Sequence, residues 1–254
     1  LKNDCNKAVG ATICRSFRPT MKASTSTLQN GFTPGRQLAQ NPVQLDCMAR
    51  IYALRCMCDR GAQSTETMLS PDSVYALACI VLFDFLAAFP SVVHMWLRLV
   101  LRHINAPIGL LYAFENMYQN VTALIKLGES WQKMFDVLSG VLQGCPLSGA
   151  LFNFAIDPLL LAFSELIVKP QLGTVLACAD DIGAAMRSLS SLKIAFKLFE
   201  MFRKVSGLSL KPQKCVIILT SVVCSETDMQ LVRGWLAQHI PLSVSYTHLT
   251  LPTI

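Results

Sequence analysis

The chain is short of charged residues. Asp, Glu, Lys and Arg make up 15% of its 254 residues, against about 25% in an average soluble domain. Hydrophobic residues reach 52%, and the mean hydropathy is +0.43. A disordered chain needs low hydrophobicity and high net charge, so this composition excludes one. It supplies enough apolar side chains for the core of one large domain or two modest ones.

The sequence also lacks a long apolar run. A helix that crosses a membrane needs about 18 or more consecutive apolar residues. The best candidate segment, residues 74–89, is interrupted by Asp84 and is followed by Pro90. Its longest uninterrupted piece, residues 74–83, has only ten residues. We therefore predict a buried strand there and expect no membrane partner.

Paired cysteine motifs are missing, although the chain has ten cysteines. No CxxC pair occurs, and the spacing of Cys56 and Cys58 is too short for the usual half of a zinc site. No signal peptide opens the chain, and 254 residues are too many for a small disulfide-stapled domain. We expect most of the cysteines to be reduced and buried as small apolar side chains.

Positive charge is concentrated in two places. The formal net charge is +6, and residues 1–60 hold nine Lys or Arg against three Asp. A second basic band, residues 187–214, holds seven Lys or Arg and one acidic residue, Glu200. Such segments attract phosphate backbones or anionic surfaces. Ordinary solvated faces explain them equally well from charge alone.

The pattern of apolar residues predicts a mixture of helices and strands without regular βαβ alternation, so the fold class is α+β. We expect residues 1–35 to be irregular, because they are polar and rich in Ser and Thr. The predicted helices are 38–60, 91–103, 107–118, 150–163 and 191–205, and the predicted strands are 75–84, 121–126, 131–137, 174–179, 182–186 and 216–222.

Three acidic residues lie in apolar surroundings. Asp180 and Asp181 are adjacent, and nothing near them in the sequence neutralises their charge. Asp84 ends a strongly apolar run, and no Lys or Arg lies within a dozen residues on either side of it. A divalent cation shared by the three would offset the cost of burying carboxylates. A solvated turn at Asp180 and a surface aspartate at Asp84 are the alternatives.

Five segments occur in a characteristic order. They are QNGFTPGR (29–36), LFDFLAAFPS (82–91), SGVLQGCPLS (139–148), CADD (178–181) and SGLSLKPQKC (206–215). Together with Arg18-Pro19, they resemble the fingers block and the palm motifs A to D of reverse transcriptases from non-LTR (LINE-like) retrotransposons. The resemblance covers residues 15–220 and implies an α+β right-hand polymerase palm with an antiparallel sheet, packed helices and partial fingers.

The resemblance implies an RNA-directed DNA polymerase that transfers a nucleotide from a dNTP to a primer 3′-hydroxyl. Asp84, Asp180 and Asp181 would hold two Mg²⁺ ions, with Mn²⁺ as an alternative. Lys214 corresponds to a lysine that protonates pyrophosphate, although a solvated lysine is the simpler explanation. The implied partners are an RNA template, a DNA primer and dNTPs. The implied substrate-binding residues are Arg36, Phe85, Phe89 (a steric gate against the 2′-hydroxyl), Gln143 and Gly144.

The sequence departs from this family at several points. Cys178 replaces the usual aromatic residue of motif C, Pro90 stands where Asp is frequent, and Lys211 stands where Asn is frequent. The segment between Arg18 and Gln29 is shorter than its counterpart. We expect a fragment: partial fingers (1–60), palm (61–222), the start of a connection to a missing thumb (223–243) and a sequencing or cloning artefact (244–254).

The alternative function is a catalytically inactive, truncated retroelement remnant with at most nucleic-acid binding. The three retained aspartates favour the enzyme, and the shortened fingers favour the remnant. Localisation, nuclear or cytoplasmic, follows only from the family resemblance. The sequence leaves the oligomeric state open.

Overall fold

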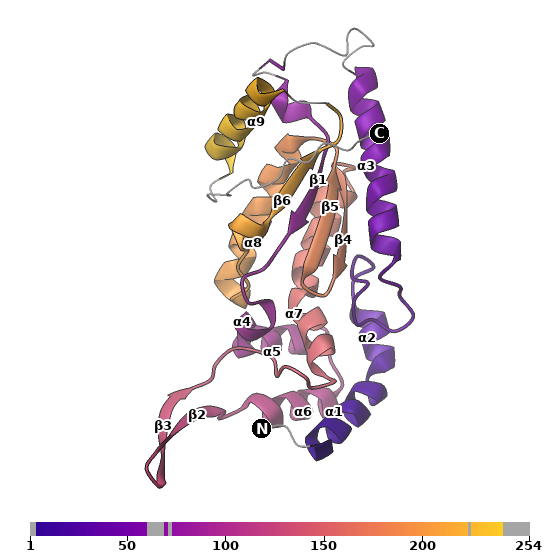
Figure 1. Ribbon diagram of the computed structural model, residues 1–254. Helices are drawn as coiled ribbons and strands as arrows, with labels where there is room; N and C mark the ends of the chain where they lie inside the picture. The colour runs from indigo at the N-terminus through magenta and orange to yellow at the C-terminus, as the bar shows by residue number, and fades with distance from the viewer. Residues whose placement is uncertain (1–3, 60–68, 71–72, 223–224, 241–254) are drawn as a thin grey trace.

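A four-stranded antiparallel sheet forms the centre of the molecule (Figure 1). The computed structural model describes residues 4–59, 69–70, 73–222 and 225–240. The strand order is β4-β5-β1-β6, so the strand that carries Asp84 at its end lies inside the sheet. The strands are β1 (Cys79–Phe83), β4 (Gly173–Cys178), β5 (Asp181–Met186) and β6 (Val216–Leu219).

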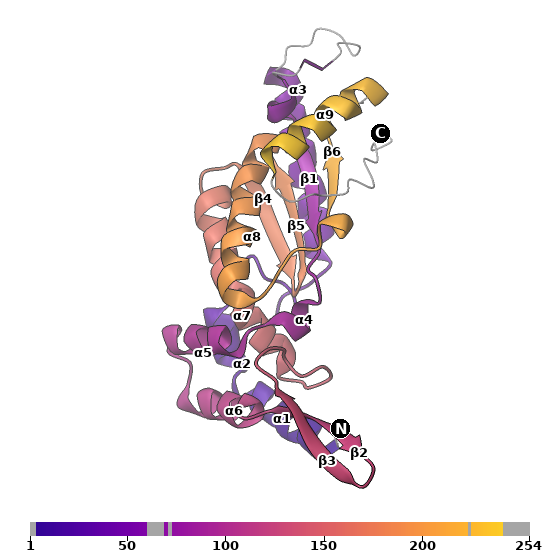
Figure 2. The same ribbon diagram turned by 90° about the vertical axis from the view of Figure 1, so that its left-hand side faces the viewer.

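Helices cover both faces of the sheet (Figures 1 and 2). The face of β1 that presents Cys79, Val81 and Phe83 joins the main core, where Phe83 contacts Phe196 and Phe199. On the other face, Leu45 packs over Gly183 so closely that a Cβ at Gly183 would lie 2.6 Å from its methyl carbon. The first face is covered by α7 (Ser148–Phe163) and α8 (Leu192–Ser206), and the second by α3 (Gln40–Asp59).

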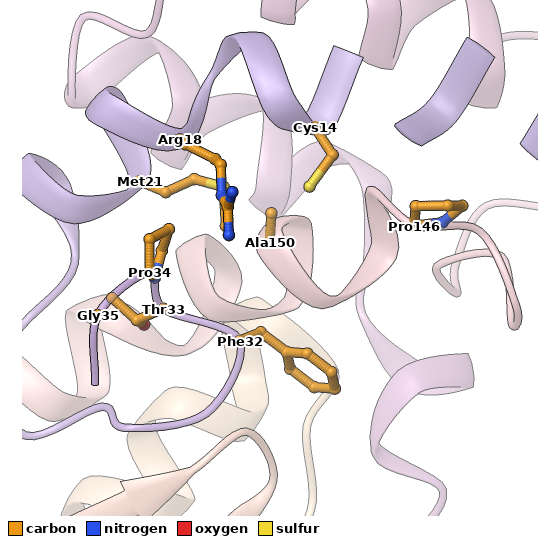
Figure 3. A pocket seen from close by; sticks show the side chains of 9 residues that line it. All are labelled: Cys14, Arg18, Met21, Phe32, Thr33, Pro34, Gly35, Pro146 and Ala150. Carbon is orange, nitrogen blue, oxygen red and sulfur yellow. The ribbon is translucent and has the colours of Figure 1, made fainter. Parts of the chain in front are cut away.

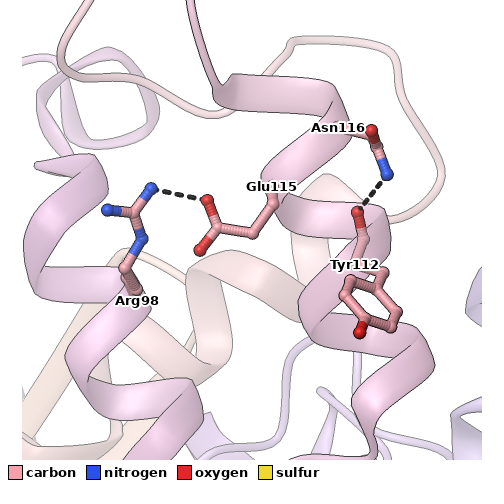
Figure 4. Close-up of polar contacts among 4 residues, drawn as sticks. All are labelled: Arg98, Tyr112, Glu115 and Asn116. Carbon is pink, nitrogen blue, oxygen red and sulfur yellow. Dashed lines mark hydrogen bonds and ion pairs between the residues drawn. The ribbon is translucent and has the colours of Figure 1, made fainter.

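A smaller unit extends from one end of the sheet. It contains α4 (Ala88–Ser91), α5 (His94–His103), α6 (Ile108–Tyr118) and a hairpin of β2 (Thr122–Leu127) and β3 (Ser130–Asp136). A partly buried ion pair, with 2.5 Å between Arg98 Nη2 and Glu115 Oε2, ties α5 to α6 (Figure 4). Within α6, the Asn116 side chain donates to the Tyr112 carbonyl at 2.8 Å. The hairpin projects away from the sheet (Figure 2).

The expectation of an irregular segment over residues 1–35 was wrong for residues 4–24 and is confirmed for residues 25–35. Residues in this range form α1 (Asp4–Ser16) and α2 (Arg18–Ser24), with Pro19 in the first turn of α2, where its missing N–H costs nothing. The polar composition gave no helical pattern for these segments. Ile13 and Cys14 of α1 pack against the main core, and such distant contacts are not visible in the local sequence. A further helix, α9 (Glu226–His239), was not expected, although Ser225 and Asp228 form a capping box at its start.

The other predicted elements are confirmed, with shifted ends. The strand expected from residue 75 begins at Cys79, after a 3₁₀ turn at Val74–Ala76, and the strand expected to reach 222 ends at Leu219. Gly207 follows α8 with φ +80°, the left-handed conformation that terminates helices. The eight cysteines described are free, as expected, but the expectation that most are buried was wrong: Cys56, Cys79 and Cys215 are buried, three others are intermediate, and Cys47 and Cys58 are exposed. The segment suggested to be an artefact, 244–254, lies outside the described residues.

Within the described residues, one helical segment is long and apolar enough to cross a membrane. It is Ser148–Val168, which comprises α7 and a π-helical turn that follows it. Most of its side chains are buried against the sheet and α8, which is the position of a core helix. Residues 74–89, the segment considered from the sequence, contain β1 and α4 instead.

The buried Asp157 of α7 makes folding depend on pH. Burial raises the pKa of its carboxyl from 3.8 to about 6, although the N–H of Ser26 and the charge of Arg36 oppose the shift. The folded chain therefore holds a proton that the unfolded chain releases between about pH 4 and 6, so Asp157 destabilises the fold as the pH rises through this range.

We predict that Asp157→Asn, which keeps an oxygen to accept from Ser26, gains stability relative to the wild type between pH 4 and pH 7. The gain is up to about 3 kcal/mol. Urea unfolding followed by tryptophan fluorescence at several pH values measures it. A difference between the two proteins that stays constant with pH would contradict this role of Asp157.

Candidate active site

The pairing of β1 with β5 brings the three aspartates to one end of the sheet. Phe83 pairs with Ile182 in antiparallel register, so the next residues along the two strands, Asp84 and Asp181, face each other. Asp180 lies in the two-residue turn between β4 and β5, whose last pair is Cys178 with Asp181. The register thus brings Asp84 and Asp180, which are 96 positions apart in the sequence, to the same end of the sheet. Their joint role in holding metal stays a prediction.

The carboxylates repel one another. Burial raises the pKa of Asp180, and the negative charges of Asp181 and Asp84 raise it further, while a hydrogen bond from its own backbone N–H opposes the rise. The Oδ2 atom of Asp84 is buried and has no hydrogen-bond partner among the described residues. The nearest cation is Lys214, whose Nζ lies 3.7 Å from that oxygen. This one lysine offsets only part of the negative charge of the three carboxylates.

The donor set has the chemistry of a divalent-metal site. Carboxylate oxygens are the ligands that Mg²⁺ prefers, and the buried Oδ2 of Asp84, which has no hydrogen-bond partner among the described residues, is an oxygen that a metal ion would satisfy. Among the residues that the structure describes, no three His, Cys, Asp or Glu side chains lie close enough together to hold a metal ion as they stand. The carboxylates therefore have the chemistry that the metal needs and lie at the same end of the sheet. To bind it, their oxygens must move closer together.

The segment that carries Lys214 is fastened to the segment that carries Asp84. The N–H of Lys211 donates to the Asp84 carbonyl at 2.7 Å, and the N–H of Leu86 donates to the Ser209 carbonyl at 2.8 Å. A 3₁₀ turn, Pro212–Lys214, then brings the exposed Lys214 side chain beside Asp84. Lys214 thus lies at the site, as predicted.

The two phenylalanines predicted to bind substrate have different surroundings. The ring of Phe85 is buried in the core and meets Phe199 edge-on at 5.7 Å, so it is not available to a substrate. The ring of Phe89 is half-buried and stacks on Phe152, with 4.5 Å between centroids. Its carbonyl accepts from the N–H of Val141 at 2.9 Å, which joins the segment after Asp84 to the loop of residues 140–147. Phe89 is thus the one of the pair whose ring is partly exposed and whose backbone is joined to this loop.

That loop presents Gln143 and Gly144, both of which are exposed. It is anchored at its start by Gly140, whose N–H donates to the Val92 carbonyl at 2.8 Å and whose φ is +96°. A Cβ at Gly140 would lie 3.0 Å from the Pro90 carbonyl oxygen, so glycine permits this close approach. The exposed Gln143 side chain and the exposed backbone at Gly144 are accessible to a ligand, and their contact with template or base pair stays a prediction.

The Arg36 side chain is held by backbone carbonyl groups of its own loop. Its guanidinium donates to the carbonyls of Ser26, Gln29 and Thr25, with 2.5 Å to Gln29 and 3.1 Å to Thr25. These bonds close the loop of residues 25–36 on itself. A direct contact of Arg36 with template or triphosphate stays a prediction, and the present hydrogen bonds do not favour it.

A cavity of about 330 Å³ adjoins this loop (Figure 3). Arg18 reaches into it between Pro34 and Ala150, and Phe32 forms part of its wall. Phe32 also meets Phe89 edge-on, with 6.4 Å between centroids. The cavity therefore lies next to the phenylalanine expected to select the sugar.

One contact at the site was not predicted as functional. Gln29 is fully buried, and its Oε1 accepts from the N–H groups of Ala179 and Gly31, both at 2.8 Å. Its Nε2 donates to the Ala179 carbonyl at 3.2 Å. The residue is part of the QNGF segment, but its partner Ala179 lies 150 positions away, so no local pattern in the sequence shows this contact.

Comparison with known proteins agrees with this geometry. Residues 7–246 match the family described as reverse transcriptase (RNA-dependent DNA polymerase). The Pol polyprotein of the type-2 retrotransposable element R2DM from Drosophila melanogaster is 26% identical over 217 residues, which are 84% of this chain and 20% of that protein. An uncharacterised 149 kDa protein of transposon TX1 from Xenopus laevis is 31% identical over 126 residues, 47% of this chain and 10% of that protein.

Solved structures show the same fold. Apo telomerase from Candida tropicalis, truncated from its C-terminal domain, superposes with a TM-score of 0.57 at 12% identity and covers 87% of this chain and 42% of that one. Telomerase from the same organism in complex with a telomeric RNA fragment gives a TM-score of 0.56 at 12% identity, with 83% and 33% covered. The chain spans about a fifth of the length of its R2DM relative. Together these matches show that the chain belongs to the reverse transcriptase (RNA-dependent DNA polymerase) family, as its likeness to non-LTR retroelements predicted.

Proposed function

We propose that the chain carries the polymerase site of an RNA-directed DNA polymerase, which adds deoxynucleotides to a primer 3′-hydroxyl on an RNA template. The observation that carries the proposal is the meeting of Asp84 with Asp180 and Asp181 at one end of the β1–β5 pair. Reverse transcriptases generally use divalent metal ions. Three carboxylates whose charge Lys214 offsets only in part suit that requirement.

Asp84 and Asp180 would hold two Mg²⁺ ions, with Asp181 assisting and Mn²⁺ as a substitute. When bound, such ions lower the pKa of the primer hydroxyl and neutralise charge on the leaving pyrophosphate. Lys214 stands 3.7 Å from Asp84, in reach of the same region, and would donate a proton to the pyrophosphate. Without metal, it partly neutralises Asp84.

Nucleic acid would lie along basic surfaces. The helix α8 presents Lys193, Lys197, Arg203 and Lys204 on its exposed side, and exposed Arg15, Arg18 and Lys22 lie on α1 and α2. Such surfaces track phosphate backbones in polymerase channels. They support an RNA template and a DNA primer as partners.

The alternative is an inactive remnant, in which the same basic surfaces would serve binding alone. A remnant would bind nucleic acid through its basic side chains and transfer no nucleotide. The retention of all three aspartates in a cluster that costs folding free energy does not favour it.

We predict that Asp180→Asn lowers Mg²⁺-dependent extension of a DNA primer on RNA by about 100-fold or more, because it removes a charged ligand where charge must be neutralised. Primer extension with labelled dNTPs measures it. Asp46→Asn, which neutralises an exposed aspartate of α3 paired with Arg50, is the matched control and should extend at the wild-type rate.

Fluorescence anisotropy with an RNA–DNA hybrid separates the two functions. Polymerase function predicts that wild type and Asp180→Asn bind the hybrid alike and that only the wild type extends it. A folded wild-type chain that binds the hybrid and extends it no better than Asp180→Asn would overturn the proposal in favour of the remnant.

A second prediction concerns the sugar. We expect Phe89→Ala to raise incorporation of ribonucleotides relative to deoxyribonucleotides by about tenfold or more, because the ring that would exclude a 2′-hydroxyl is gone. Single-nucleotide incorporation with dNTP and rNTP gives the ratio of kcat/KM values. The control is Leu86→Ala, an exposed residue of the same segment. An unchanged ratio in Phe89→Ala would contradict the gate.

A further inference from the structure

The segment around Gln29 lies beside the strand that leads to the catalytic turn. Gln29 and Ala177 form a parallel bridge. The N–H of Ala177 donates to the Leu28 carbonyl, and the N–H of Asn30 donates to the Ala177 carbonyl, both at 2.8 Å. The edge of β4 that does not face β5 therefore pairs with the segment around Gln29, close to the end of the strand. This pairing brings the Gln29 side chain to the turn that contains Ala179 and Asp180.

The turn has a backbone conformation that needs support. Ala179 has φ +54°, in the left-handed region that is sterically unfavourable for an L-residue with a Cβ. Glycine or asparagine is the usual choice in such a two-residue turn. Residues held in such conformations persist when their surroundings fix them, and they concentrate at functional sites.

The Gln29 side chain holds Ala179 in this conformation by hydrogen bonds to both its N–H and its carbonyl. One amide side chain accepts from the Ala179 N–H at 2.8 Å and donates to the Ala179 carbonyl at 3.2 Å. The contact is buried from water, since Gln29 and Ala179 are 0% and 4% exposed. A primary amide satisfies both groups at once because it carries a donor and an acceptor side by side. The carbonyl of Ala179 belongs to the peptide that leads directly into Asp180.

Gly31 allows the approach. A Cβ at this position would lie 2.4 Å from the Ala179 nitrogen, so no other residue fits without a backbone shift. The Gly31 N–H donates to Gln29 Oε1, which fixes the amide, and the Gly31 carbonyl accepts from Asn153 Nδ2 of α7 at 2.7 Å. The loop is thus anchored to α7 while it holds the turn.

We propose that Gln29 is a positioning residue for catalysis: its side chain clamps the Ala179 peptide and thereby orients Asp180. This inference rests on the proposed polymerase function. Gln29 acts only through the backbone of the turn. The specific consequence is that loss of the clamp lowers kcat while the bulk of the fold and the affinity for template and primer are retained.

The first test measures the clamp itself and needs no catalysis. Gln29→Met keeps the length and volume of the side chain and removes its donor and acceptor. Hydrogen–deuterium exchange of the Ala179 amide, resolved by NMR, should accelerate by about tenfold or more in this variant, because Gln29 Oε1 accepts from this N–H. Amides in the β1–β5 ladder should exchange as in the wild type.

Asn41→Leu is the matched control. Asn41 is buried, and its Nδ2 donates to the Ala177 carbonyl at 3.1 Å, on the same strand but two residues before Ala179. It should leave protection of the Ala179 amide unchanged.

The second test is primer extension by the same variants. We expect kcat to fall about 10- to 100-fold in Gln29→Met, since small misplacements of catalytic groups cost rates of this size, with KM for template–primer within about twofold. Asn41→Leu should keep kcat within about twofold. Unchanged exchange at Ala179 in Gln29→Met, or faster exchange there with kcat unchanged, would overturn the positioning role.

The outcomes separate this inference from the polymerase proposal. An inactive wild-type chain refutes the proposed function and, with it, the catalytic role of Gln29, whatever the exchange data show. An active wild type whose kcat is insensitive to Gln29→Met refutes the positioning role alone.

Discussion

The antiparallel register between β1 and β5 is the constraint on which the site depends. Phe83 opposite Ile182 makes Asp84 the neighbour of Asp181, and a slip of one residue would send every side chain of β1 to the other face of the sheet. The register is held by burial, because Val81 and Phe83 must face the core formed with α7 and α8. The core therefore decides where the carboxylates meet.

The same register concentrates negative charge at one edge of the sheet. Neighbouring segments offset part of the repulsion between the carboxylates and hold the residues in place. Lys214 offers partial neutralisation from the segment after α8, which is fastened to Asp84 through Lys211. The Gln29 loop approaches from the other side and holds the β4–β5 turn at Ala179. One segment thus contacts Asp84 and the other holds the turn that contains Asp180, so both support the edge of the sheet where the carboxylates repel one another.

The sequence predicted the elements whose signal is local. Apolar runs predicted the sheet strands, and helical periodicity predicted α3, α5, α7 and α8. The isolated carboxylates were chosen from their apolar surroundings, and the β1–β5 register brings Asp84 to the same end of the sheet as Asp181. Polar α1 and α2 were missed because their stability comes from distant packing. The burial of the Phe85 ring, the carbonyl partners of Arg36 and the clamp by Gln29 also depend on tertiary contacts, which no local pattern encodes.

The central claim is that these carboxylates form a metal site when the chain meets its substrates. Anomalous X-ray diffraction from crystals grown with Mn²⁺, a dNTP and an RNA–DNA hybrid tests it most directly. The account predicts manganese bound between Asp84 and Asp180, with their oxygens drawn together from the present arrangement, in which the described residues offer no ligand group of three. Manganese bound elsewhere, with these two carboxylates unliganded, would contradict it.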